Sequence, residues 1–404
     1  MPASDRNRRG GLSISADARA ILAVQALRAF AYGLGSVLIG ASLARSGLSG
    51  SAVGGVLASL LAGAALVSVL LARYGDRIGR RRCYRFLLVV MAGAGAVFAL
   101  TSWLPALILA GLTGTVSTDV VESGPFTSLE QAMLPHAAGE AGSTRLFGTY
   151  NTIATLAGSL GALAAAASAL VPGHARELLL AYPVVAALAL APAGRLSGVV
   201  EVDHELEGES RPPLQRSRKA VAQLSALFAL DSFGGGFVVQ TFIAYLLAEK
   251  YGASTRTLAI LFFAIGLLQA VSFQVAVRLA ERFGLLRTMV FTHLPSNLLL
   301  AAVAFAPNLP TAIALLLGRF ALSQMDVPTR QAYVVAVVDP AERTAAAAYT
   351  NTARYAVRPV APVVAGLIVG SSLGAPFLIA GALKSAYDLA FYALFRRTPV
   401  AADG

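Results

Sequence analysis

The stretch Ala72-Arg-Tyr-Gly-Asp-Arg-Ile-Gly-Arg-Arg-Arg82 is a short basic segment between two long apolar runs, Val53–Leu71 and Phe86–Trp103. About 20 apolar residues in a helix cross the ~30 Å hydrocarbon core of a bilayer, and each run has about that length. A short loop this rich in arginine is retained on the cytoplasmic side. The stretch therefore predicts two membrane-spanning helices joined by a cytoplasmic turn.

Four residues of this segment are expected to act in gating. Gly79 allows a tight turn, Asp76 suits a helix N-terminus, and Arg77 and Arg80 are suited to pairing with carboxylates on neighbouring helices. The pattern Asp-Arg-x-Gly-Arg-Arg-Arg resembles the signature between helices 2 and 3 of the major facilitator superfamily, although Ala72 stands where a glycine is usual. The resemblance implies a secondary transporter of the drug or organic-solute proton antiporter type, in which two six-helix halves rock about a central cavity.

The composition indicates an all-α membrane protein. Of the 404 residues, 56% are hydrophobic and only 13% are charged, whereas soluble domains carry roughly 25% charged residues. Among the loops, the odd-numbered ones hold few of the Lys and Arg residues, namely Arg45, Arg176, Lys250 and Arg256. This asymmetry predicts that both termini are cytoplasmic. The net charge of +11 is thus explained by topology, and we expect no nucleic-acid partner.

The apolar runs predict twelve transmembrane helices in two six-helix halves, the major facilitator fold. The expected helices are Ala18–Leu43, Ser51–Arg73, Cys83–Trp103, Pro105–Leu134, Thr144–Val171, Arg176–Leu196, Ala220–Lys250, Ser254–Ala280, Arg287–Phe305, Leu309–Ala336, Arg343–Gly370 and Ala375–Phe395. The expected organisation is an N-terminal tail (1–17), an N-terminal half (18–196), a cytoplasmic linker (197–219), a C-terminal half (220–396) and a C-terminal tail (397–404).

The two halves repeat each other. Asn151-Thr152 recurs as Asn351-Thr352. The segment 76–79 recurs as Glu281-Arg282-Phe283-Gly284. Each match is weak alone, but they share a common register and the linker lies midway. Together they predict two parallel structural repeats, as in one class of transporter folds.

Ionisable residues inside the expected helices are the main functional candidates, because burying charge in a membrane is costly. In the fold that the chain resembles, helices 1, 4, 7 and 10 line the cavity. We expect substrate binding or proton coupling at Arg28, Asp119, Glu122, Asp231, Arg319, Asp326, Arg354 and Arg358. Asp231 ranks first for the proton because it lies near the middle of its helix and precedes Gly234-Gly235-Gly236.

Corresponding positions of the two halves carry opposite charges. The repeat aligns Arg28 with Asp231, Asp119 with Arg319, and Glu130 with Arg330. A pseudo-twofold axis would bring such positions together, so we expect salt bridges between the halves. In particular, Glu130 and Arg330 are expected to meet when the cytoplasmic side closes. The alternative is that these charges form static structural pairs.

Other classes of protein find no support. None of the three lysines follows a glycine, so there is no Gly-Lys-[Ser/Thr] motif of a P-loop. The four histidines lack metal-ligand spacing, and no hydrolase motif occurs. We therefore expect no enzyme activity, no cofactor and no metal.

Secondary transport across the plasma membrane remains the best interpretation. The first hypothesis is proton-coupled efflux of a small organic solute by a monomer embedded in the lipid bilayer. The second is import or exchange of an organic anion bound by Arg28, Arg319, Arg354 or Arg358. The Gly-Pro step that is usual in helix 5 of related drug exporters is missing here. A membrane receptor that has lost transport is a third possibility, but it would carry few intramembrane charges.

Overall fold

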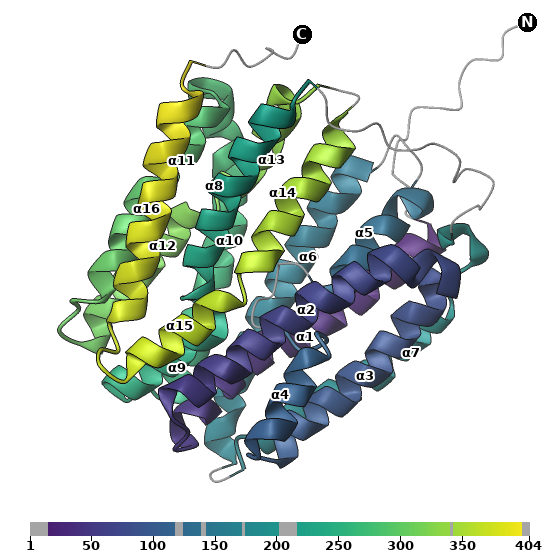
Figure 1. Ribbon diagram of the computed structural model, residues 1–404. Coiled ribbons are helices and arrows are strands. Elements are labelled where there is room, and N and C mark those ends of the chain that lie inside the picture. Colours follow the sequence, from purple (N-terminus) through teal and green to yellow (C-terminus); the bar gives the residue numbers. More distant parts are fainter. Residues whose placement is uncertain are drawn as a thin grey trace, which may run out of the picture.

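The computed structural model describes residues 15–117, 124–138, 143–171, 174–201, 216–339 and 342–397. Every regular element in these ranges is helical (Figure 1). The α-helices of the N-terminal half are α1 (Ala16–Arg45), α2 (Gly50–Ile78), α3 (Arg80–Leu100), α4 (Leu104–Leu112), α5 (Pro125–Ala138), α6 (Ser143–Ala164) and α7 (Ala181–Gly194). Short 3-10 helices are η2 (Ala165–Leu170), η3 (Glu177–Leu180) and η4 (Gly198–Val200).

The C-terminal half continues with nine α-helices. They are α8 (Arg218–Gly236), α9 (Gln240–Tyr251), α10 (Thr255–Phe283), α11 (Leu285–Val303), α12 (Leu309–Ser323), α13 (Asp326–Val337), α14 (Arg343–Val357), α15 (Val360–Val369) and α16 (Ala375–Phe395). Each of the twelve expected runs thus contains one helix or a pair of shorter ones. Nine helical stretches in the described ranges are long and apolar enough to cross a membrane.

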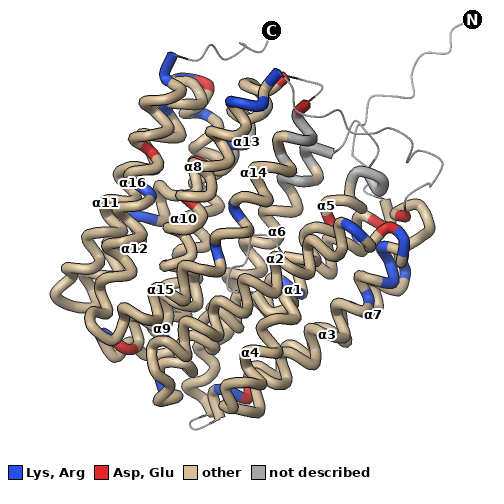
Figure 2. The backbone as a smooth tube through the Cα atoms, in the orientation of Figure 1, with Lys and Arg blue, Asp and Glu red and all other residues tan. Residues whose placement is uncertain are grey.

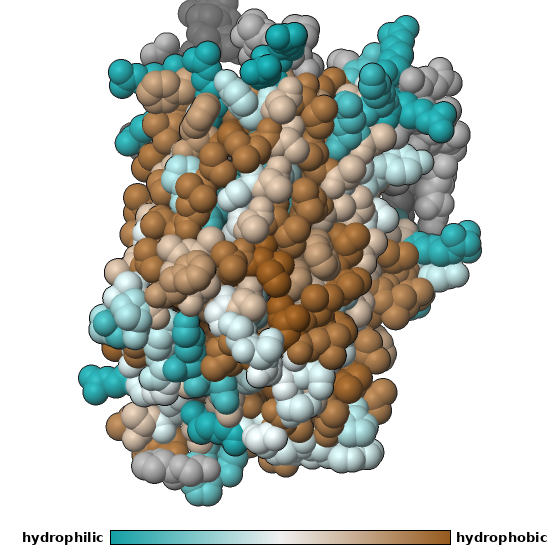
Figure 3. All heavy atoms as spheres, turned by 60° about the vertical axis from the view of Figure 1, so that its left-hand side comes forward, coloured by the Kyte–Doolittle hydropathy of each residue, from teal (hydrophilic) through white to brown (hydrophobic). Residues whose placement is uncertain are grey.

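The outer surface suits a lipid environment. Large apolar side chains such as Leu66, Phe86, Leu188 and Leu389 are more than half exposed. On the face shown in Figure 3, a broad hydrophobic surface lies between more hydrophilic ends. Lys and Arg gather where α2 meets α3 (Figure 2). The all-helical membrane architecture is therefore confirmed, while the count of twelve spans and the cytoplasmic termini stay predictions.

The two halves contact each other mainly through α1 with α9, α2 with α15, and α6 with α10. The α2–α15 contact depends on glycine, because a Cβ on Gly366 would lie 2.8 Å from the Cα of Gly54. Gln240 Nε2 also donates to Ser36 Oγ across the interface at 2.9 Å. These contacts join the halves near the start of α2 and the end of α15.

The halves separate toward the opposite end. Among the described elements, neither α5 nor α13 packs extensively against the other half. The first residue of α1 and the last of α16 lie at this same end (Figure 1). If the termini are cytoplasmic, as the charge pattern predicts, the structure is an inward-open arrangement.

The glycine triplet 234–236 coincides with a helix break, as its low helix propensity suggests. The expected seventh helix is divided into α8, which ends at Gly236, and α9, which begins at Gln240. A Cβ on Gly236 would lie 2.6 Å from the carbonyl oxygen of Arg358. Only glycine therefore permits this close approach of α8 to the break between α14 and α15.

Candidate functional site

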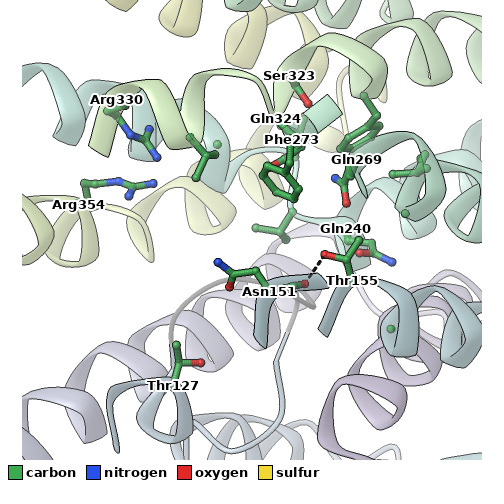
Figure 4. A pocket seen from close by; sticks show the side chains of 18 of the residues that line it. Thr127, Asn151, Thr155, Gln240, Gln269, Phe273, Ser323, Gln324, Arg330 and Arg354 are labelled. Carbon is green, nitrogen blue, oxygen red and sulfur yellow. Dashed lines mark hydrogen bonds between the residues drawn. The ribbon is translucent and has the colours of Figure 1, made fainter. Parts of the chain in front are cut away.

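A cavity of about 350 Å³ lies between the two halves. Figure 4 shows that side chains from both halves point into it. The N-terminal half lines it from α5 and α6, with Thr127, Ser128, Gln131, Asn151, Thr155, Gly158 and Ser159. The C-terminal half contributes further amides at Gln240, Gln269, Gln324 and Asn351, and phenyl rings at Phe262, Phe273 and Phe320.

Among the residues that the structure describes, the charges that line this cavity are all on one side and of one sign. The four arginines Arg319, Arg330, Arg354 and Arg358 line it, together with His293. All five belong to the C-terminal half, while the N-terminal wall is neutral and polar. Among the described residues that line the cavity, none is an aspartate or a glutamate. In the described part of the chain, the cavity is therefore basic on one wall and neutral on the other.

Breaks in the C-terminal helices border the cavity. Val238 and Val239 separate α8 from α9, Gln324 follows α12, and Arg358 follows α14, and all four residues line the cavity. The first turn of α9 begins beside the cavity at Gln240. Broken helices of this kind often frame the substrate site of secondary transporters, and their N-termini favour negative charge.

A network of buried charges lies behind the arginine wall. Asp231 receives a hydrogen bond from the Lys384 ammonium, and its other oxygen lies 3.4 Å from Arg330 Nη1. Arg330 Nη1 also lies 3.2 Å from Asp326 Oδ2, one turn earlier. Arg354 lies beside Arg330 and points into the cavity (Figure 4). Two cations thus balance Asp231, which does not line the cavity itself.

A second buried cluster lies inside the N-terminal half. Arg28 Nη2 lies 2.6 Å from Glu130 Oε2, and the Arg28 guanidinium lies 4.8 Å from the ring centroid of Phe126. The hydroxyl of Tyr84 donates to Glu130 at 2.6 Å, and the hydroxyl of Tyr150 donates to the same carboxylate. Neither Arg28 nor Glu130 lines the cavity.

These positions change several expectations. The predicted bridges between the halves, Arg28 with Asp231 and Glu130 with Arg330, are not formed in this structure, because each charge has a partner within its own half. Arg319, Arg354 and Arg358 do line the cavity, as expected for substrate residues. Asp119 and Glu122 lie outside the described residues.

The sequence did not indicate that His293 lines the cavity and contacts a buried carboxylate. Its Nδ1 lies 2.9 Å from Asp388 Oδ1, and Asn297 Nδ2 donates to Asp388 Oδ2 at 2.8 Å. Lys384 is one turn from Asp388 and could have paired with it, but it binds Asp231 instead. His293 and Asn297 lie on α11 and Asp388 lies on α16. Their spacing in the sequence does not predict that they are in contact.

The arginine-rich segment 72–82 contacts α5. Gly79 has a φ of +99° where α2 ends and α3 begins. Arg80 Nε lies 2.7 Å from Asp76 Oδ1, and its Nη1 donates to the Ala132 carbonyl of α5 at 3.1 Å. Arg77 is exposed. Arg80 thus reaches the end of the expected fourth helix, although its acceptor there is a carbonyl and not Glu130.

Glu201, which lies inside the expected linker (197–219), binds the start of α3 beside this segment. It accepts the backbone N–H of Arg80 at 2.6 Å and the Nε–H of Arg81 at 3.1 Å. Partial burial opposes ionisation of the carboxyl, but these hydrogen bonds outweigh it and lower the pKa of Glu201 below its usual value. An ionised Glu201 therefore caps the start of α3.

Comparisons with known proteins found a family model, a curated relative and solved structures. The sequence model of the Major Facilitator Superfamily matches residues 224–404. "Uncharacterized membrane protein YJR124C" of Saccharomyces cerevisiae is 26% identical over 422 residues, which covers 94% of each chain.

Solved transporters have the same fold. A crystal structure of the nucleoside transporter NupG is 15% identical and covers 95% of this chain and 100% of its own, with a TM-score of 0.72. The xylose transporter XylE of E. coli, inward open, is 15% identical with a TM-score of 0.70, covering 95% of this chain and 97% of its own.

Proposed function

Because the chain belongs to the Major Facilitator Superfamily, we propose that it is a secondary active transporter of a small organic anion in the plasma membrane. The solute binds in the cavity between the halves and crosses by alternating access. The observation that carries this proposal is the wall of four arginines, together with the lack of any carboxylate among the described lining residues.

The arginines favour an anionic group on the solute. A guanidinium offers a planar fork of N–H donors that fits carboxylate and phosphate oxygens, and hydrogen bonds between two charged groups are stronger than neutral ones. Arg330 and Arg354 point into the same region of the cavity (Figure 4). A lipophilic cation would meet only like charge on this wall.

The neutral wall favours hydroxyl groups on the rest of the solute. Side-chain amides such as Asn151 and Gln269 both donate and accept hydrogen bonds, and Phe273 offers an apolar face. Two proteins with this fold are described as a nucleoside transporter and a xylose transporter, and both solutes carry several hydroxyls. We therefore place the solute among hydroxylated organic acids or phosphates that fit about 350 Å³.

Proton-coupled efflux is a second candidate function, favoured by the buried carboxylates of both halves. Glu130 and Asp231 each lie beside an arginine, Arg28 and Arg330 respectively. A change of partner during rocking would alter the proton affinity of either carboxylate.

A thermal-shift experiment with matched solutes tests the proposal. Purified protein in detergent is heated with D-xylose or D-xylonate, and with uridine or uridine 5′-monophosphate. A solute that binds only the folded state raises the melting temperature by mass action. In each pair we expect the anion to stabilise more than the neutral solute. Stabilisation by the neutral member alone would contradict an anion site.

A further inference from the structure

His293 combines contact with the cavity and a buried carboxylate partner. Its side chain lines the cavity although only 3% of the residue is exposed. Asp388, which is fully buried, lies behind it on α16 at 2.9 Å from Nδ1. Asn297 holds the second oxygen of Asp388 at 2.8 Å. The carboxylate is therefore fixed in place from two sides.

This geometry determines which ring nitrogen exchanges a proton. An ionised carboxylate only accepts hydrogen bonds, so Nδ1 of His293 must carry hydrogen and donate to Asp388. Nε2 is then the nitrogen that remains for the cavity. Imidazole is the side chain whose charge ordinarily changes between pH 5 and 8. Protonation at Nε2 would add positive charge to the wall that carries the arginines.

Three of the helices packed against α11 carry charged or titratable residues in the same region as His293. α16 carries Lys384 and Tyr387 beside Asp388, α13 carries Asp326 and Arg330, and α12 carries Arg319. Asp231 of α8 and Arg354 of α14 lie in the same network. α10 has its charges in its first turn and last two turns, at Arg256, Arg278, Glu281 and Arg282. Charges of both signs surround the imidazole, so a bound anion can shift its protonation equilibrium.

We propose that His293 is a proton-binding site of the cavity, and that the transported anion and this proton bind together. The inference rests on the proposed function, because it requires an anion at the arginine wall. An anion near Nε2 stabilises the imidazolium, and the imidazolium in turn stabilises the anion. Thermodynamic linkage makes the two effects equal. The proton then crosses with the anion and leaves with it.

The experiment measures the protonation of His293 directly. Histidine labelled with ¹³C at Cε1 is introduced into protein whose other histidines, His136, His174 and His204, are replaced by Gln. The Cε1 chemical shift is followed from pH 5 to 8, with and without millimolar sulfate, which stays a dianion throughout. We expect the signal to titrate, and sulfate to raise the protonated fraction at a fixed pH by roughly twofold or more.

The control is Arg354→Gln, which removes charge from the wall and leaves the His293 cluster intact. It should still show titration but lose most of the sulfate effect. A signal that does not move between pH 5 and 8, or that titrates without responding to sulfate, would overturn the inference. If sulfate raises the melting temperature while the protonated fraction stays unchanged, the anion site stands and only the coupling to His293 fails.

Asp388 positions the imidazole of His293, and two substitutions at Asp388 test that role. Asp388→Asn leaves an amide that no longer requires hydrogen on Nδ1, so the sulfate response should fall. Asp388→Glu retains the carboxylate and should restore part of it. Equal loss in both variants, with intact melting curves, would show that the carboxylate has no special part in positioning the imidazole.

Discussion

Arg28 Nη2 lies 2.6 Å from Glu130 Oε2, wholly within the N-terminal half. In the C-terminal half, the positions that the repeat assigns to these two residues hold Asp231 and Arg330, which lie 3.4 Å apart. An ion pair thus joins α1 to α5 in one half and the equivalent helices, α8 and α13, in the other, with the positions of the acid and the base exchanged. The opposite charges noticed in the repeat reflect two internal bridges, so each half carries its own buried pair and can move as a unit.

Removing one member of the N-terminal pair should be strongly destabilising. Glu130→Gln leaves Arg28 as a buried, uncompensated charge, which typically costs about 3–5 kcal/mol. Replacing both residues with methionine should cost less than the single change. The melting temperature of purified protein measures both, with the exposed Glu249→Gln as the control. Equal or greater loss in the double variant would argue against a direct pair.

The close glycine contact between α2 and α15 should control which end is open. Gly54→Val should separate the halves at this contact, because Gly54 lies against Gly366. Gly55→Val is the matched control, since a Cβ there meets nothing within 4 Å.

Thiol labelling measures this change. With Cys83→Ser and Gln324→Cys, labelling from the side of the termini should slow in the Gly54 variant and remain unchanged in the Gly55 variant. Equal labelling rates in the two variants would mean that this contact does not hold the halves together.

Removal of one arginine from the wall should weaken anion binding specifically. Arg354→Gln should reduce the affinity for D-xylonate by roughly tenfold, the order expected for one charge-assisted hydrogen bond. Arg256→Gln removes the same charge from an exposed site on α10 and should have little effect. A concentration series of thermal shifts gives both values. Similar weakening in the two variants would indicate only long-range attraction.

Glu201 should give the cytoplasmic segment a pH-dependent stability. Its pKa is lower in the folded protein than its usual value of 4.5, so the stabilisation is present above that value and is lost as the pH falls through the folded pKa. Glu201→Gln should therefore lower the free energy of unfolding at pH 7 by less than about 1 kcal/mol, because the group is partly exposed, and this appears as a slightly lower melting temperature. The difference from the unmodified protein should shrink below about pH 4.5. A difference that stays constant with pH would exclude this role.

Much of the fold is readable from the sequence because the membrane imposes a simple rule. Apolar runs and arginine-rich turns place the helices, and the glycines at 234–236 mark a break that the structure contains. The pairing of charges was harder to predict. A repeat identifies equivalent positions, such as Arg28 and Asp231. It does not determine the distance between these two side chains, which lie in halves that are expected to move relative to each other.

The basic wall and the His293 cluster were only partly foreseeable. Arg319, Arg354 and Arg358 stood out because charge is rare inside apolar helices. His293 and Asp388 lie on helices far apart in the chain, and only their packing brings them within 2.9 Å. The amides of the cavity, such as Asn151 and Gln269, are ordinary polar residues until the fold gathers them around one space.

The most direct test of the central claim is uptake into proteoliposomes that contain the purified protein. Radiolabelled D-xylonate and D-xylose are compared, with protein-free liposomes and the Arg354→Gln variant as controls. We expect D-xylonate to accumulate faster than D-xylose, and the variant to lose most of this preference. Uptake of D-xylose with no uptake of D-xylonate, or equal rates for the unmodified protein and the variant, would contradict an anion transporter built on the arginine wall.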